Sequence, residues 1–190
     1  MHVADAQREG RRIFIVGFVG QVVSGGLWLV SAAFATWMSP KAGIIAIVLG
    51  GPLIFPLTQA ILRASGRPAA LSAGNPLGQL AMQVAFTIPV TLPVVAGAAL
   101  YRLNWFYPAC MIVVGAHYFP FVFLYGMWQF WILGGLMVAG GVMIALYAST
   151  SFTLGAWVTV VLLVAFAFVG RSVAQKESSQ SRMVVGGEAL

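Results

Sequence analysis

Long stretches without a charged residue constrain this 190-residue chain more than any other feature. Residues 13–40, 42–62, 68–101 and 103–170 contain no Asp, Glu, Lys or Arg. A helix needs about 20 apolar residues to cross the hydrocarbon core of a bilayer, so each of the first three stretches fits one crossing, and the last is long enough for three. Because only 7% of the residues are charged, against about 25% in soluble domains, a water-soluble enzyme and a disordered chain are both excluded.

We predict an all-α fold, a polytopic membrane helix bundle in which six transmembrane helices pair as three helical hairpins. Stretches that are apolar on every side favour helices over a β-barrel, whose strands alternate apolar and polar residues. Turns at Tyr125-Gly126 and at 148–151 divide the longest stretch, and Asn75-Pro76 is a typical helix start. The expected spans are 13–38, 42–62, 76–100, 105–125, 127–147 and 152–170.

The distribution of Lys and Arg indicates the orientation of the bundle. With six crossings, eight basic residues lie on the side of both termini, whereas Lys41 and Arg102 lie on the other side. The positive-inside rule then places a basic N-terminal segment, 1–12, and a flexible tail, 171–190, in the cytoplasm of a bacterium, with the bundle in its inner membrane. The basic residues are expected to contact anionic lipid headgroups, and no nucleic-acid partner is expected. Tyr107 is among the aromatic residues expected at the opposite membrane interface.

Polar side chains inside the spans are the candidates for a ligand site. Apart from tyrosines and Cys110, His117 is the only ionisable residue deep in a span, and such residues are functional candidates by default. Phe121 and Tyr125 follow His117 at four-residue steps and therefore share its face. In the third span a polar residue also recurs every four positions from Asn75 to Thr87. The candidate ligand-binding residues, expected to converge on a pocket in the cytoplasmic half of the bundle, are His117, Asn75, Gln79, Gln83, Tyr118, Tyr125 and Gln21. The competing interpretation is that these side chains only form hydrogen bonds between helices.

Several chemistries lack the residues that they need. No span contains Asp or Glu, which disfavours ion-coupled transport, and a single histidine cannot hold a catalytic metal. No phosphate-binding loop or nucleotide motif is present, so no cofactor is expected. Ser24 and His117 are a conceivable pair for an intramembrane hydrolase, although Val22 stands where the usual motif has glycine. Glycines at 134, 135, 140 and 141 indicate a small face that lets helices approach closely.

Four short motifs, in order along the chain, resemble a family of small bacterial membrane proteins known only as a domain of unknown function. They are Gly74-Asn75-Pro76-Leu77-Gly78, Gly115-Ala116-His117-Tyr118-Phe119, Tyr125-Gly126 and Phe130-Trp131-Ile132-Leu133-Gly134. The resemblance extends to about residue 170. It implies a multi-helix protein of the bacterial inner membrane and no particular activity.

We therefore expect a protein without catalytic activity that binds a small molecule or passes it through the membrane as a transporter. Besides the lipid bilayer, the expected partners are this small molecule and a second copy in a homodimer. One alternative is a structural or stress-related membrane protein without a ligand. The other, less favoured, is an intramembrane hydrolase.

Overall fold

The protein is an all-α bundle in a computed structural model that describes the backbone of residues 1–187 and the side chains of residues 1–173 and 175. Six helical segments among the described residues are long and apolar enough to cross a membrane, as the charge-free stretches predict. The elements are α1 (Val3–Phe14), η1 (Ile15–Gly17), α2 (Phe18–Trp37), α3 (Pro40–Gly50), η2 (Gly51–Leu53), α4 (Ile54–Ala64), α5 (Leu77–Tyr101), η3 (Leu103–Trp105), α6 (Phe106–Tyr125), α7 (Gln129–Tyr147) and α8 (Leu154–Gly187).

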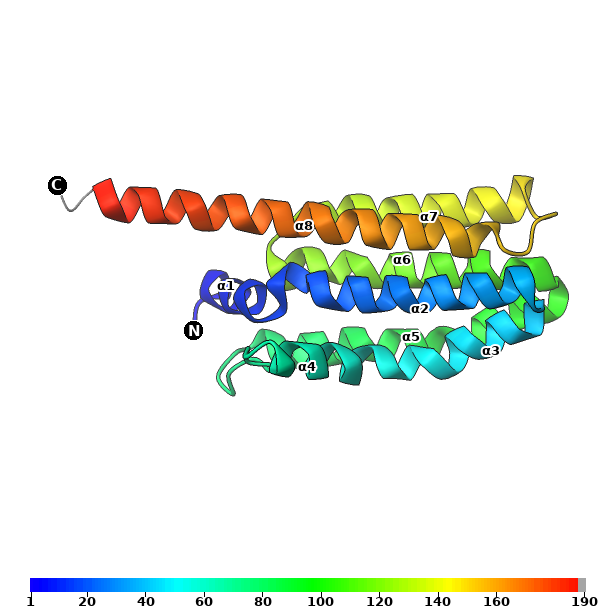
Figure 1. Cartoon of the computed structure of the whole chain (residues 1–190), viewed down its shortest axis with the longest axis horizontal. Coiled ribbons are helices and arrows are strands. Elements are labelled where there is room, and N and C mark those ends of the chain that lie inside the picture. The colour runs from blue at the N-terminus through cyan, green and yellow to red at the C-terminus, as the bar shows by residue number, and fades with distance from the viewer. Residues whose placement is uncertain (188–190) are drawn as a thin grey trace.

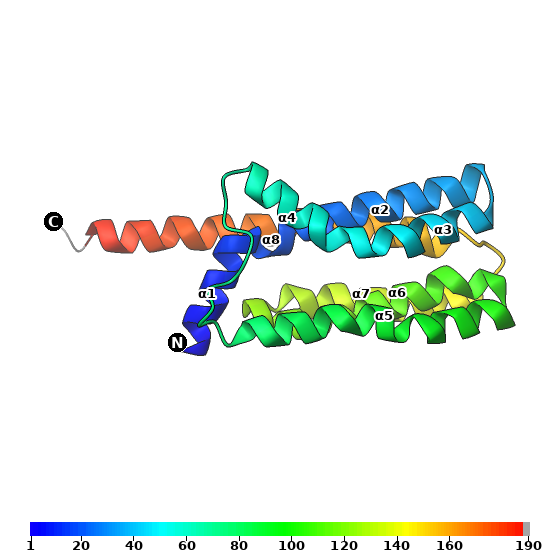
Figure 2. The same ribbon diagram turned by 90° about the horizontal axis from the view of Figure 1, so that it is seen from below.

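The six spans form two layers (Figures 1 and 2). One layer holds α2, the broken helix α3–η2–α4, and α8, and the other holds α5, α6 and α7. Consecutive spans run in opposite directions and so form the three predicted hairpins. The most extensive packing, however, joins different hairpins, because α6 lies against α7, and α2 also lies against α8. The first and last spans are therefore neighbours, and α1, the connection between α4 and α5, and the α6–α7 turn lie at one end of the bundle.

Two helix boundaries differ from the prediction. The first span begins at Phe18 and not at residue 13, because Ile15 and Val16 take left-handed backbone angles, with φ of 50° and 59°, and end the preceding helix. The segment after residue 170, expected to be flexible, is helical as far as Gly187. No proline interrupts this segment, and its Ala, Gln, Lys and Glu residues favour helix. The remainder of the predicted tail, 188–190, lies outside the described residues.

Glycines set the close approach of α6 and α7. A methyl group added at Gly134 would lie 2.8 Å from the carbonyl oxygen of Gly115, and one added at Gly141 would lie 2.8 Å from that of Pro108. One added at Gly115 would lie 2.9 Å from the backbone nitrogen of Val138. Because such distances leave no room for a side chain, these three glycines bring the two backbones into direct contact, as small residues do at membrane helix crossings.

A buried polar network joins α6 to the other layer at the far end of the bundle. The hydroxyl groups of Ser31 and Tyr107 are 2.7 Å apart, and the Ser31 hydroxyl also lies 2.8 Å from the carbonyl oxygen of Gly43. Tyr107 donates to the carbonyl oxygen of Ser31 at 3.2 Å. Tyr107, which is expected among the interfacial aromatics, has a fully buried side chain, because a hydroxyl partner inside the bundle satisfies the phenol.

Helix α5 lies at the edge of its layer and packs mainly on α6. Along its length only Leu77, Val84 and Val95 are buried, and these three residues mark the side that faces α6. Most of the surface of α5 is therefore left uncovered by the rest of the bundle.

The glycine contacts generate a paired prediction. Gly134→Ala should lower stability by about 1–3 kcal/mol, the usual cost of overpacking a tight contact, because the new methyl group meets a backbone carbonyl that cannot move aside. Gly135→Ala is the matched control, since no atom lies within 4 Å of the added carbon. The measurement is the midpoint of thermal unfolding of the purified protein in detergent. Equal midpoints for the two variants would contradict the proposed role of the α6–α7 contact.

Candidate functional site

Five rings on α6 and α7 form a cluster in the half of the bundle nearest α1. The aromatic cluster consists of His117, Tyr118, Phe121, Tyr125 and Phe130. The ring centroids of His117 and Phe121 are 5.1 Å apart, and those of Phe121 and Tyr125 are 5.7 Å apart, as their four-residue spacing predicts. Phe130 of α7 lies 5.5 Å from Tyr125 with nearly parallel rings. Tyr118, Tyr125 and Phe130 are buried, so this part of the cluster is a packed interior.

His117 lies at the margin of the aromatic cluster, where α6 meets α5. Its side chain is half-buried, and its Nδ1 atom is 3.1 Å from the Thr87 hydroxyl oxygen. The backbone of Val84 also interacts with the ring. The hydrogen bond between Thr87 and His117 is a polar contact between α5 and the aromatic cluster. The Thr87 side chain itself is exposed.

The other predicted site residues divide between separate places. Tyr118 and Tyr125 belong to the aromatic cluster, whereas Gln21 is buried on α2. Gln79 and Gln83 are exposed on α5, with Gln83 one helical turn from Thr87 on the same side of the helix. The structure therefore brings His117, Tyr118 and Tyr125 together, and places Gln83 near their margin.

The side chain of Asn75 joins α1 to the start of α5. Its side-chain oxygen accepts a hydrogen bond from the backbone of Leu77 at 2.9 Å, which confirms its role at the helix start. Its side-chain nitrogen donates to the carbonyl oxygen of Ala6 at 3.2 Å and to the Glu9 carboxylate at 2.9 Å. With its amide groups engaged in this way, Asn75 positions helices at the end of the bundle.

Helix α1 crosses the end of the bundle from one layer to the other (Figure 2). The Glu9 carboxylate accepts hydrogen bonds from the backbone and the hydroxyl group of Ser72, at 2.7 and 3.0 Å. On the other side, Gln7 donates to the carbonyl oxygen of Phe123 at 2.6 Å, and Arg11 donates to that of Tyr125. The helix thus ties the α4–α5 connection to the end of α6.

The turn after α1 packs against the aromatic cluster. A methyl group added at Gly17 would lie 3.7 Å from the Tyr125 ring and 3.8 Å from the Phe130 ring. Three successive residues, Ile15, Val16 and Gly17, have positive φ, and this conformation is strained for β-branched side chains. The contacts of α1 hold this turn in place and close the end of the cluster.

Sequence reasoning did not identify α1 as a separate helix. The pattern that could have identified it is the apolar spacing of Ala6, Gly10 and Ile13, which are the buried residues of α1 and share one face of a helix. The left-handed turn has no comparable pattern, because isoleucine and valine are unusual in that conformation.

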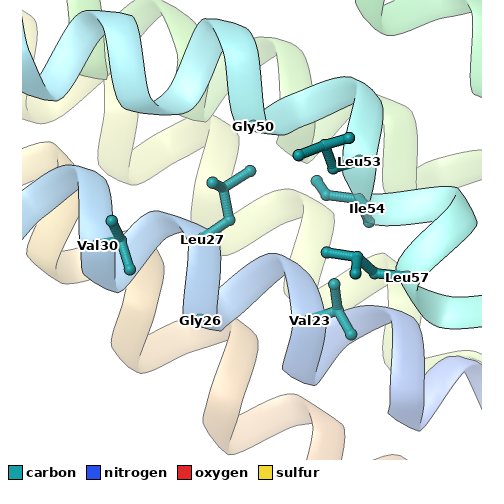
Figure 3. A pocket seen from close by; sticks show the side chains of 8 residues that line it. All are labelled: Val23, Gly26, Leu27, Val30, Gly50, Leu53, Ile54 and Leu57. Atoms are coloured by element: carbon teal, nitrogen blue, oxygen red, sulfur yellow. The ribbon is translucent and has the colours of Figure 1, made fainter. Parts of the chain in front are cut away.

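A second feature is an open apolar cleft of about 380 Å³ between α2 and the broken second span (Figure 3). A 3-10 turn at Gly51–Leu53 interrupts the second span at this point, and Gly50 lies against Leu27 of α2. The cleft offers no charged or hydrogen-bonding side chain, and its lining residues are Val23, Gly26, Leu27, Val30, Gly50, Leu53, Ile54 and Leu57.

The two residues on which a hydrolase would depend lie on α2 and α6, and among the described residues no hydrogen bond joins them. Ser24 is buried on α2, in the layer of α2 and α8. His117 directs its Nδ1 atom to Thr87 on α5, in the other layer.

The sequence matches the profile of one protein family over residues 3–171, from the first residue of α1 to the point where α8 leaves the bundle. The description of this family is "Family of unknown function (DUF7010)". Comparison with curated proteins and with solved structures gave no match.

The contacts of α1 generate a prediction about pH. Hydrogen bonds from the Ser72 backbone and then the Asn75 side chain lower the pKa of the Glu9 carboxyl from its ordinary value of 4.5. A lowered pKa in the folded state means that the stabilising contribution is complete above the ordinary value and is lost as pH falls through the lowered one. We expect the hydrogen-exchange protection factors of α1 to persist near pH 4.5 and to fall only in stronger acid.

Glu9→Gln should lower the protection of α1 at neutral pH and remove this pH dependence. Asp5→Asn is the matched control, because Asp5 pairs only with Arg8 of the same helix, in an exposed ion pair of little energetic value. If Asp5→Asn and Glu9→Gln lower protection equally, Glu9 does not hold α1.

Proposed function

Because the chain belongs to DUF7010, a family of unknown function, we propose its function from its own structure: a membrane protein without catalytic activity that binds a small molecule where His117 meets Thr87. The binding surface consists of His117, the adjoining ring of Phe121, and the Gln83–Thr87 side of α5. Binding there serves either recognition or passage of the molecule. Passage would not be ion-coupled, because the spans contain no carboxylate.

The observation that carries this proposal is the partial exposure of His117 at the margin of a packed aromatic cluster. An ionisable side chain in a span is energetically costly, so its presence there indicates a functional role. Aromatic rings beside it offer a large apolar contact surface. A half-buried histidine bordered by such rings therefore suits a small molecule with one polar group and an apolar body.

A second candidate function is structural, and the position of α5 favours it. This helix packs mainly on α6, and the Thr87–His117 hydrogen bond ties the two helices together. Hydrogen bonds between membrane helices contribute about 0.6 kcal/mol on average. In this case His117 stabilises the bundle and binds no ligand.

The two functions differ in what the loss of His117 changes. The probe is 1-naphthol, a fluorescent aromatic molecule with one hydroxyl group, titrated into protein in lipid nanodiscs, with empty nanodiscs as the baseline. His117→Ala should weaken saturable binding about fivefold, the equivalent of about 1 kcal/mol for one hydrogen bond, and leave the thermal midpoint nearly unchanged. His2→Ala, at the exposed N-terminus, is the matched control and should bind as the wild type does.

The structural function predicts the opposite result. His117→Ala would then lower the thermal midpoint, and wild-type nanodiscs would take up no more 1-naphthol than empty ones. Binding that is equal in the wild type and His117→Ala would also contradict a site at this residue.

We propose further that the bundle lies in a bacterial inner membrane with both termini in the cytoplasm. This proposal is supported by the basic residues of α1, the α4–α5 connection and the start of the α8 extension, which gather at one end of the bundle. Arg8, Arg12, Arg63, Arg67 and Arg171 are exposed there. Anionic lipid headgroups at the cytoplasmic surface would contact these side chains.

Cysteine labelling tests the orientation. In a Cys110→Ala background, Ser65→Cys and Ser151→Cys each place one thiol at an exposed position, at opposite ends of the bundle. In spheroplasts, a membrane-impermeant maleimide should label the Ser151→Cys protein and should label the Ser65→Cys protein only after lysis. The reverse pattern would place the termini outside.

A further inference from the structure

The hydrogen bonds around Thr87 determine which nitrogen of His117 carries a hydrogen. A threonine hydroxyl has one hydrogen to donate and two lone pairs that accept. Thr87 donates this hydrogen to the carbonyl oxygen of Val84, 2.7 Å away. With its hydrogen directed to Val84, the hydroxyl oxygen acts as an acceptor toward His117.

In this arrangement Nδ1 of His117 is the donor in the 3.1 Å contact with Thr87. A neutral imidazole carries a hydrogen on only one of its two nitrogens, so Nε2 is left with a free lone pair. Among the described residues, the side-chain hydrogen bond of the His117 ring is made by Nδ1, and the ring also interacts with the backbone of Val84. The Thr87 hydroxyl in this arrangement favours the tautomer that presents Nε2 as an acceptor at the α5–α6 margin.

We propose that the ligand of this site is a neutral molecule with a hydroxyl or N–H group on an aromatic or apolar body, and that this group donates its hydrogen to Nε2 of His117. The inference rests on the proposed binding function and adds the chemical class of the ligand. Molecules that only accept hydrogen bonds, such as ethers and ketones, cannot pair with Nε2. A metal ion would need further ligands, and the described residues contain no group of three His, Cys, Asp or Glu side chains that could supply them.

The surroundings of Nε2 fit this class. Phe121 presents its ring 5.1 Å from the His117 ring, a separation typical of aromatic pairs, so an aromatic body can pack beside both. His117 is eight residues from the end of α6 at Tyr125, or about 12 Å along the helix at 1.5 Å per residue. At this depth, between α5 and α6, a small amphipathic molecule would enter sideways from the bilayer.

The open apolar cleft between α2 and the broken second span, called the α2–α4 cleft from here on, is the competing site within the same molecule. It is lined by eight apolar residues, so it would bind an aromatic body without regard to a donor group. A comparison of two probes that differ only in the donor therefore distinguishes the two locations.

The test compares 1-naphthol with 1-methoxynaphthalene, in which a methyl group replaces the hydroxyl hydrogen, on the protein in nanodiscs. We expect 1-naphthol to bind about fivefold more tightly after correction for lipid partitioning, the difference that one hydrogen bond provides. His117→Ala should remove this preference. Thr87→Val, which takes away the acceptor that fixes the tautomer, should reduce it, and Thr87→Ser should preserve it.

Nitrogen-15 NMR of labelled histidine supplies a readout that does not depend on affinity. In the wild type, Nδ1 of His117 should appear as a protonated nitrogen and Nε2 as an unprotonated one, and the Nε2 resonance should shift when 1-naphthol is added. In Thr87→Val the two tautomers should exchange.

Each alternative outcome has a distinct meaning. A protonated Nε2 in the wild type, or equal affinity for both probes with a loss of both in His117→Ala, would overturn the ligand class and leave the binding function standing. Equal affinity for both probes that is insensitive to His117→Ala would assign binding to the α2–α4 cleft and overturn the site itself. If neither probe binds saturably to the wild type, the proposed function fails.

Discussion

The direct contact between the backbones of α6 and α7 is the interaction on which the rest of the bundle depends. The charge-free spans must associate through van der Waals packing and a few hydrogen bonds, because lipid supplies no hydrophobic driving force between helices. Gly115 and Gly134 allow that packing by removing side chains from the contact. Once α6 is fixed against α7, its remaining faces can each meet another part of the chain.

Helix α6 makes polar contacts with other parts of the chain at three positions along its length. Near its start, Tyr107 reaches Ser31 of α2 and so joins the two layers. In its second half, His117 reaches Thr87 of α5. At its end, the backbone of Tyr125 accepts a hydrogen bond from α1. The candidate site is thus the middle of three polar contacts made by one helix, and it is the one that remains partly open.

Charge and periodicity predicted most of the fold and part of the site. The charge-free stretches indicated six spans, and four-residue spacing indicated that His117, Phe121 and Tyr125 share a face, because both properties depend only on local geometry. The same spacing could not indicate which neighbour each face meets. Gln79 has the periodicity of a buried stripe and is exposed, since α5 lies at the edge of its layer. The separate helix α1 depends on a left-handed turn that the residue types disfavour and that tertiary contacts hold.

In the proposed function, a molecule with a hydrogen-bond donor binds at the α5–α6 margin and nowhere else in the bundle. The most direct measurement is the pattern of intermolecular nuclear Overhauser effects between bound 1-naphthol and selectively labelled protein in nanodiscs. Binding at the α5–α6 margin predicts effects to the two carbon-bound ring protons that flank Nε2 of His117, and to the ring of Phe121. Effects to the methyl groups of Leu27 and Leu57 in the α2–α4 cleft, without any to His117, would contradict it.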